Sequence, residues 1–304
     1  MAHSHQHQHL PAVGLKLLLA TAATLLFVGV EVGVGVAANS LALIGDALHN
    51  FTDALALVVA LSAVTLARRA PTSSKSFGYQ RAGVLAAFVN AGVLVGVTIF
   101  VFVEAVRRIL LPEPVNTLWM IYVAAAAVVL NSAIAFSLRQ EGRDDINIRS
   151  AVLHVLSDAL ASLGILLGAL LIRWTGKSIF DPIISVGIGV VILMSSWGIL
   201  RETVNLLLEG TPRGIDPEAV TVEMGQVEGV RGVHHLHIWA LAPSSPALSC
   251  HVLLGDVSLK STREVFSRIN AMLGDRFHIS HATIQFEHVG CPEDDPFCAI
   301  NPDR

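Results

Sequence analysis

The stretch LALIGDALHNFTDALALVVALSAVTLA, residues 41–67, decides the fold class of this chain. It is longer than the roughly 20 residues that an α-helix needs to cross a bilayer. Its only ionisable side chains are Asp46, His49 and Asp53. Ionisable groups inside a membrane helix are costly and usually functional. The stretch therefore predicts a membrane-spanning helix that carries a polar site.

Five further apolar stretches are long enough to cross a bilayer. They lie at residues 13–38, 82–106, 115–138, 150–174 and 179–206. The composition agrees, since 53% of the residues are hydrophobic, 14% are charged and the mean hydropathy is +0.63. An ordinary soluble domain carries about 25% charged residues. We expect an α-helical membrane protein with six transmembrane helices in a domain over residues 13–208.

The orientation follows from the connections between these stretches. Lys and Arg are concentrated after the second and the fourth predicted helix. They are Arg68, Arg69, Lys75 and Arg81 in one connection and Arg139, Arg143 and Arg149 in the other. Because positive charge favours the cytoplasmic side, both termini are expected in the cytoplasm.

The character of the chain changes beyond residue 211. Asp216-Pro217 is typical of a helix start, and residues 232–242 and 247–256 are typical of strands. A capping box from Ser261 to Glu264 predicts a helix to about residue 277, and a third strand follows at 279–288. The order αββαβ predicts a ferredoxin-like cytosolic α+β domain over residues 212–290. Residues 1–12, which are rich in His, are expected to be disordered, and residues 291–304 to form a flexible tail.

Two matching patterns carry the chemistry. LHNFTDALA, residues 48–56, repeats as LHVLSDALA, residues 153–161. Each places a His four residues before an Asp, so that His49 lies over Asp53 and His154 over Asp158 on one helix face. Two imidazoles and two carboxylates make a closed tetrahedral set that suits zinc.

Three segments carry a resemblance to a known family. NSLALIGDALHNFTD (39–53), KSFGY (75–79) and GVHHLHIW (232–239) resemble the signatures of the cation diffusion facilitator family, close to its bacterial CzcD-like, zinc-type branch. The resemblance implies a homodimer in the inner (cytoplasmic) membrane that exchanges cytosolic Zn²⁺ for protons, a secondary transporter and not an enzyme. It also implies that His49, Asp53, His154 and Asp158 are the intramembrane ligands.

The resemblance implies a second, regulatory metal site at His234, His251 and Glu287 in the cytosolic domain. Further candidates for that site are His237, His281, His288, Cys291 and Cys298. In the membrane domain Asp46 lies on the face of His49 and is a candidate for the release path, whereas Glu31 is interpreted as a packing or hydrogen-bonding residue.

Other classes of function fit less well. The net charge of −4, with no long basic run, argues against nucleic acid as a partner. Three cysteines are too few for a disulfide framework. A haem-binding electron carrier is an alternative, although an Asp one turn from each His would be an odd neighbour for haem. Within the family, cobalt, cadmium, nickel, manganese and iron remain alternative substrates.

Overall fold

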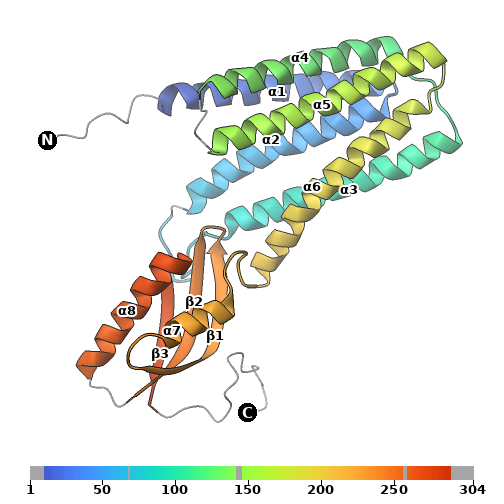
Figure 1. The fold of residues 1–304 in the computed structure, drawn as a ribbon. Coiled ribbons are helices and arrows are strands. Elements are labelled where there is room, and N and C mark those ends of the chain that lie inside the picture. The colour runs from blue at the N-terminus through green and yellow to red at the C-terminus, as the bar shows by residue number, and fades with distance from the viewer. Residues whose placement is uncertain (1–9, 68, 142–145, 256–258, 289–304) are drawn as a thin grey trace. The chain divides into compact units, whose positions relative to one another are not determined.

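The computed structural model describes residues 10–67, 69–141, 146–255 and 259–288 (Figure 1). These residues form two compact units, residues 1–58 with 89–198 and residues 59–88 with 199–304.

Six long helices occupy the first two thirds of the chain. They are α1 Leu10–Ala37, α2 Leu41–Ala67, α3 Ala82–Leu110, α4 Thr117–Glu141, α5 Ile146–Thr175 and α6 Phe180–Leu207. All six predicted helices are found, with ends that differ by a few residues from the predicted ones. Over the described side chains, α3 to α6 are long and apolar enough to cross a bilayer. Membrane crossing by α1 and α2 stays a prediction.

In the membrane unit, α4 lies along α5 and beside α1 (Figure 1). A buried apolar cluster joins Leu43 of α2, Met120 of α4 and Ile165 of α5. The α5–α6 contact is close at Gly168, where an added Cβ would lie 1.9 Å from the Ile184 side chain. Small residues of this kind let membrane helices approach one another closely.

The connection between α1 and α2 is a tight hairpin that contains Asn39. Its φ of 54° is in the left-handed region, which Asn tolerates at the end of a helix. The Ser40 N–H donates back to the Gly35 carbonyl at 2.9 Å, which closes α1. The Asn39 carbonyl oxygen accepts from Arg108 of α3 at 2.7 Å, so the hairpin is tied to α3.

Asp181, at the start of α6, caps the start of α2. Its carboxylate is fully buried and accepts hydrogen bonds from the Ser40 hydroxyl at 2.6 Å and from the Leu41 N–H at 2.7 Å. Arg108 Nη1 lies 3.9 Å away. A carboxylate at a helix N-terminus satisfies free N–H groups and is favoured by the helix dipole. Asp181 therefore joins α6, α2 and α3 at one end of the unit.

The cytosolic part has the predicted order αββαβ. It consists of α7 Pro217–Gly225, β1 Val230–Ala242, β2 Ser245–Leu254, α8 Leu259–Phe277 and β3 His281–Glu287. The sheet order is β1-β2-β3, with β1 antiparallel and β3 parallel to β2. Val220 of α7, Leu248 of β2 and Ile269 of α8 are fully buried in one core.

The local structure of the cytosolic part agrees with one predicted helix start, contradicts another, and contains an irregular strand. Asp216 caps α7 as predicted, since its carboxylate accepts from the Glu218 N–H at 3.1 Å. The capping box at Ser261 is wrong as a helix start, because α8 already begins at Leu259. The strand β1 is not regular, since its register with β2 shifts between His234 and His237. His235 lies in this irregular part with a φ of 50°.

We expect Asp181→Ala to destabilise the membrane unit by about 3 kcal/mol, because it leaves the Ser40 hydroxyl and the Leu41 N–H without their acceptor and removes the buried charge near Arg108. Asp181→Asn keeps one acceptor oxygen and should cost less. The measurement is denaturant unfolding of the purified protein in detergent. Ser196→Ala is the control, since within the described part of the chain this buried hydroxyl bonds only inside α6, to the Ile192 carbonyl. Equal stability of Asp181→Ala and Ser196→Ala would contradict the role of the cap.

Candidate metal sites

The two His-Asp pairs predicted from the sequence meet in the membrane unit. Asp53 Oδ2 lies 3.1 Å from His154 Nε2 and 3.6 Å from His49 Nε2. Asp158 Oδ1 lies 3.8 Å from His49 Nε2, and Asp158 Oδ2 lies 3.8 Å from His154 Nε2. Each carboxylate therefore faces both imidazoles, one from its own helix and one from the other helix.

The geometry of these four side chains follows from their helical spacing. A separation of four residues stacks each His over its Asp, so α2 and α5 need only bring two faces together. The imidazole rings of His49 and His154 meet edge to face, with their centroids 6.4 Å apart. Both imidazoles direct Nε2 at the carboxylates, which leaves two nitrogen and two oxygen ligands around one place.

The four groups differ in exposure. The side chains of Asp158 and His49 are 12% and 16% exposed, whereas that of His154 is 51% exposed. In a single protomer the set is therefore closed on the side of His49 and open on the side of His154. A cation can reach such a set from the side of His154, while Asp158 and His49 lie on the more buried side.

Two more acids lie deep in the same unit. Asp46 and Glu31 are both fully buried. Asp46 Oδ2 accepts a hydrogen bond from the Ser162 hydroxyl of α5 at 3.2 Å. Asp46 Oδ1 and both carboxylate oxygens of Glu31 have no hydrogen-bond partner among the described residues. Glu31 lies beside Asp46 and Asn50, so its interpretation as a packing or hydrogen-bonding residue stays a prediction, and nothing in the sequence around it signalled its position.

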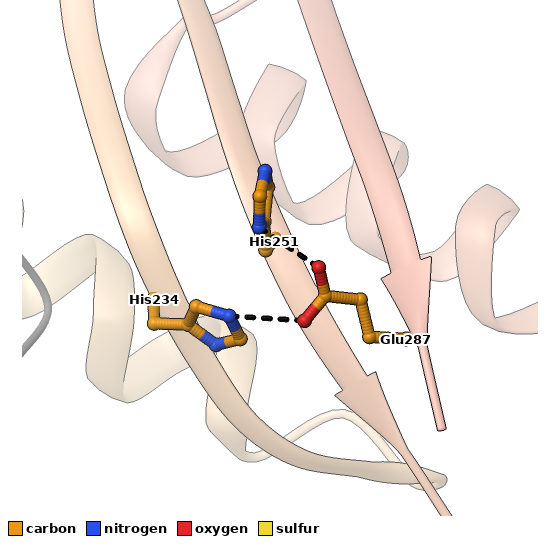
Figure 2. Close-up of side chains that lie close together, drawn as sticks. All are labelled: His234, His251 and Glu287. Atoms are coloured by element: carbon orange, nitrogen blue, oxygen red, sulfur yellow. Dashed lines mark ion pairs between the residues drawn. The ribbon is translucent and has the colours of Figure 1, made fainter. Parts of the chain in front are cut away.

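The cytosolic trio also comes together, with one residue on each strand (Figure 2). Glu287 Oε2 lies 3.1 Å from His234 Nε2, and Glu287 Oε1 lies 2.9 Å from His251 Nδ1. One ligand atom of each residue lies within 4.8 Å of the others. The register explains the geometry, because His234 pairs directly with His251, and Glu287 pairs with Leu253 two residues farther along β2.

His235 is a neighbour that the sequence analysis did not single out. Its ring stacks on that of His251, with centroids 4.8 Å apart and planes inclined by 28°. The positive φ of His235 and the register shift that follows His234 turn this side chain toward the trio, where strict alternation along β1 would point it to the other face.

The remaining candidates lie elsewhere. His237 is exposed and lines a cavity of about 840 Å³ together with Trp239 and Phe77. His281 meets Phe77 edge to face, with ring centroids 5.7 Å apart. Neither His237 nor His281 joins the metal cluster found among the described residues. Cys291 and Cys298 lie outside the described residues.

The trio predicts a pH dependence of the cytosolic domain without metal. Burial lowers the pKa of His251, and the nearby His235 and His234 act in the same direction, although Glu287 opposes them. The unfolded chain therefore binds the proton more tightly than the folded one, and stability is lost as the pH falls through about 6.5. Urea unfolding of the fragment 212–304, which has its own core, at pH 7.5 and 5.5 measures this loss.

The matched variant for this measurement is His251→Gln, which should lose less stability over the same pH range because its side chain does not titrate. A wild-type domain that loses no more stability than His251→Gln between pH 7.5 and 5.5 would contradict the prediction.

Both parts of the chain match known protein families. Residues 17–208 match the cation efflux transmembrane domain, and residues 212–289 match the cytoplasmic domain of cation efflux proteins. The metal cation efflux system protein CzcD of Cupriavidus metallidurans is 38% identical over 256 residues, which are 84% of this chain and 81% of that protein.

Two other relatives agree with the family, and one solved structure is similar to part of the chain. The zinc transporter ZitB of Escherichia coli is 40% identical over 87% of this chain and 83% of its own length. The cadmium, cobalt and zinc/H(+)-K(+) antiporter of Bacillus subtilis is 35% identical over 82% of this chain and 81% of its own length. A solved structure of the metal-bound C-terminal domain of a CzcD transporter is 38% identical and covers 24% of this chain and 99% of that domain, with a TM-score of 0.22. The chain is a multi-pass membrane protein and belongs to the cation efflux, or cation diffusion facilitator, family of transporters.

Proposed function

We propose that this protein exports a zinc-type divalent cation from the cytoplasm, and that His49, Asp53, His154 and Asp158 hold the cation in transit. The observation that carries the proposal is the meeting of two His-Asp pairs from α2 and α5, with carboxylate–imidazole distances of 3.1 to 3.8 Å. Relatives that cover more than 80% of this chain are named as zinc transporters or as cadmium, cobalt and zinc antiporters.

The ligand set favours zinc over harder cations. Imidazole suits Zn²⁺ and its neighbours among the transition metals, whereas Mg²⁺ and Ca²⁺ take oxygen ligands. Two neutral imidazoles and two carboxylates also give a neutral complex with a divalent ion, which lowers the cost of carrying the charge through the membrane domain. Cobalt and cadmium fit the same set, so a flux comparison at equal concentrations decides the selectivity.

Transport should depend on each ligand of the membrane site. We expect His49→Ala and Asp158→Asn to reduce zinc flux into inverted vesicles by at least about a hundredfold, because a set of three ligands loses affinity. The protein should still fold, as judged by size-exclusion chromatography in detergent.

The control for this measurement is Ser157→Ala, next to Asp158 on α5, since among the described residues the Ser157 hydroxyl bonds only to the Leu153 carbonyl of its own helix. Wild-type flux in folded Asp158→Asn would remove the site from the transport path.

Protons are the proposed counter-ion, through the metal ligands themselves. A metal binds neutral imidazole, so zinc and protons compete for the same nitrogen lone pairs. Free imidazole has a pKa of about 6.5, within the range of pH found on the two sides of a bacterial membrane. With both termini in the cytoplasm, zinc would bind at near-neutral pH and leave where acid protonates the histidines.

An imposed pH gradient tests this coupling. We expect acid inside inverted vesicles to drive zinc entry, and an ionophore that collapses the gradient to slow it. Zinc binding to the purified protein should weaken as the pH falls from about 7.5 to 5.5. Zinc entry that is insensitive to the ionophore, together with pH-independent binding, would exclude proton exchange at these ligands.

The cytosolic domain is proposed to dimerise and to bind a regulatory zinc ion at His234, His251 and Glu287. The support is the compact three-ligand cluster and the match to the cytoplasmic domain of cation efflux proteins. Transport is assigned to residues 13–208 and this role to residues 212–290. Three protein ligands leave a fourth position for water or for another residue.

Zinc should therefore stabilise the isolated domain. At a free concentration of 100 times the dissociation constant, the gain is about 2.7 kcal/mol. Thermal melting of residues 212–304 with and without zinc measures it, and Glu287→Gln should lose most of the gain. His237→Gln, which alters an exposed His outside the cluster, is the control. A melting temperature that zinc leaves unchanged would show that the trio does not bind zinc and that its residues make ordinary polar contacts.

A further inference from the structure

We propose that Glu31 and Asp46 form a second, all-oxygen cation site, which receives the divalent cation from the His-Asp set on its way out of the protein. The proposal rests on the proposed export function and extends its path. The residues that carry it are two buried acids on α1 and α2 with three carboxylate oxygens that no described residue satisfies.

The two acids belong to one cluster. The polar neighbours of the Glu31 side chain are Asp46 and Asn50. Asp46 and Asn50 are four residues apart on α2, so they share one helix face. Ser162 of α5 closes the cluster, since its hydroxyl donates to Asp46 Oδ2 at 3.2 Å. Two carboxyl groups and the Ser162 hydroxyl, with the Asn50 side-chain amide beside them, then lie around one buried place.

Burial of two adjacent carboxyl groups needs compensation, either by bound protons or by a cation. Within the described residues no Lys or Arg forms an ion pair with Glu31 or Asp46, and both side chains are fully buried. A buried carboxylate without partners costs free energy in a low-dielectric interior, and two adjacent ones repel each other. Asp181 differs from Glu31 and Asp46, because its buried carboxylate accepts hydrogen bonds from the Ser40 hydroxyl and the Leu41 N–H and lies near Arg108. A transiting divalent cation removes the cost at Glu31 and Asp46.

The position of the pair fits a path. Ser162 links the pair to the His-Asp set, because its hydroxyl lies 3.2 Å from Asp46 Oδ2 and 3.0 Å from the Asp158 carbonyl oxygen. Along α2, Asp46 precedes the middle of the His49–Asp53 segment by about 7 Å, toward the α1–α2 hairpin. With the termini in the cytoplasm, that hairpin is on the outer side. The pair therefore lies one step beyond the His-Asp set in the direction of export.

The ligand types at the two sites favour movement of the cation in one direction. Zinc prefers a set that includes imidazole nitrogen, whereas carboxylate, amide and hydroxyl oxygens suit harder cations. An all-oxygen site therefore holds zinc more weakly than the His-Asp set. It can accept the ion when the histidines release it, and then lose it readily to water.

The test uses the full-length protein and the double variant Glu31→Gln with Asp46→Asn, which keeps side-chain size and removes both charges. In liposomes at saturating zinc we expect turnover to fall at least about tenfold. Zinc affinity at the His-Asp set, measured by titration calorimetry in detergent, should change less than about threefold. Thr98→Val, which removes another buried hydroxyl of this unit, should leave both values unchanged.

A second measurement detects the site directly. In Asp53→Asn with Asp158→Asn, which lacks the main site, weak Cd²⁺ binding is followed by equilibrium dialysis. Adding Glu31→Gln with Asp46→Asn should remove one bound Cd²⁺ per protomer. The cytosolic trio is present in both proteins and contributes equally.

Three results would overturn the inference. The first is a double variant whose turnover is unchanged. The second is a double variant that loses both turnover and zinc affinity at the main site. The third is a double variant that turns over slowly although the added substitutions leave Cd²⁺ binding unchanged. The last would assign the acids to proton movement. Failure of the export function itself looks different, because the wild-type protein would then show no zinc flux.

Discussion

The hydrocarbon interior of a membrane does not tolerate unpaired ionisable groups, and this constraint organises the whole membrane unit. Two histidines and two aspartates on apolar helices are acceptable only where they face one another. The contact between Asp53 of α2 and His154 of α5, at 3.1 Å, satisfies both groups across the two helices. The buried cluster around Met120 includes Leu43 of α2 and Ile165 of α5 and so packs these two helices together, while the close approach at Gly168 packs α6 on α5.

A second set of polar contacts fixes one end of the same unit. Asp181, Arg108 and Asn39 tie α6, α3 and the α1–α2 hairpin together through short hydrogen bonds. These groups bond to one another, whereas Asp46 Oδ1 and the Glu31 carboxylate oxygens have no hydrogen-bond partner among the described residues. The first set of polar groups stabilises the fold without a ligand, whereas in our proposal a passing cation binds the second set.

Much of the fold was predictable because its signals are local. Apolar length gives the six helices, and the four-residue spacing of His49 and Asp53, repeated at His154 and Asp158, gives the face that each pair occupies. The structure brings the four side chains together, while their role as metal ligands stays a prediction. The αββαβ order of the cytosolic part is confirmed for the same reason, since strand alternation and a helix N-cap at Asp216 are local patterns.

The parts that sequence reasoning missed depend on contacts between distant residues. The cap that Asp181 provides for α2 joins residues 140 positions apart in the chain. The proximity of Glu31 to Asp46 depends on how α1 packs on α2, and the orientation of His235 depends on a shifted register between β1 and β2. The start of α8 was misplaced because the pattern at Ser261 fits a capping box equally well inside a helix.

The central claim is that one divalent cation binds between α2 and α5. It is tested most directly by zinc-edge anomalous diffraction from crystals of the full-length protein grown with Zn²⁺. The account predicts a peak about 2.0 to 2.2 Å from His49 Nε2, His154 Nε2 and one oxygen each of Asp53 and Asp158. Anomalous peaks confined to the cytosolic domain, with none among these four side chains at saturating zinc, would contradict it.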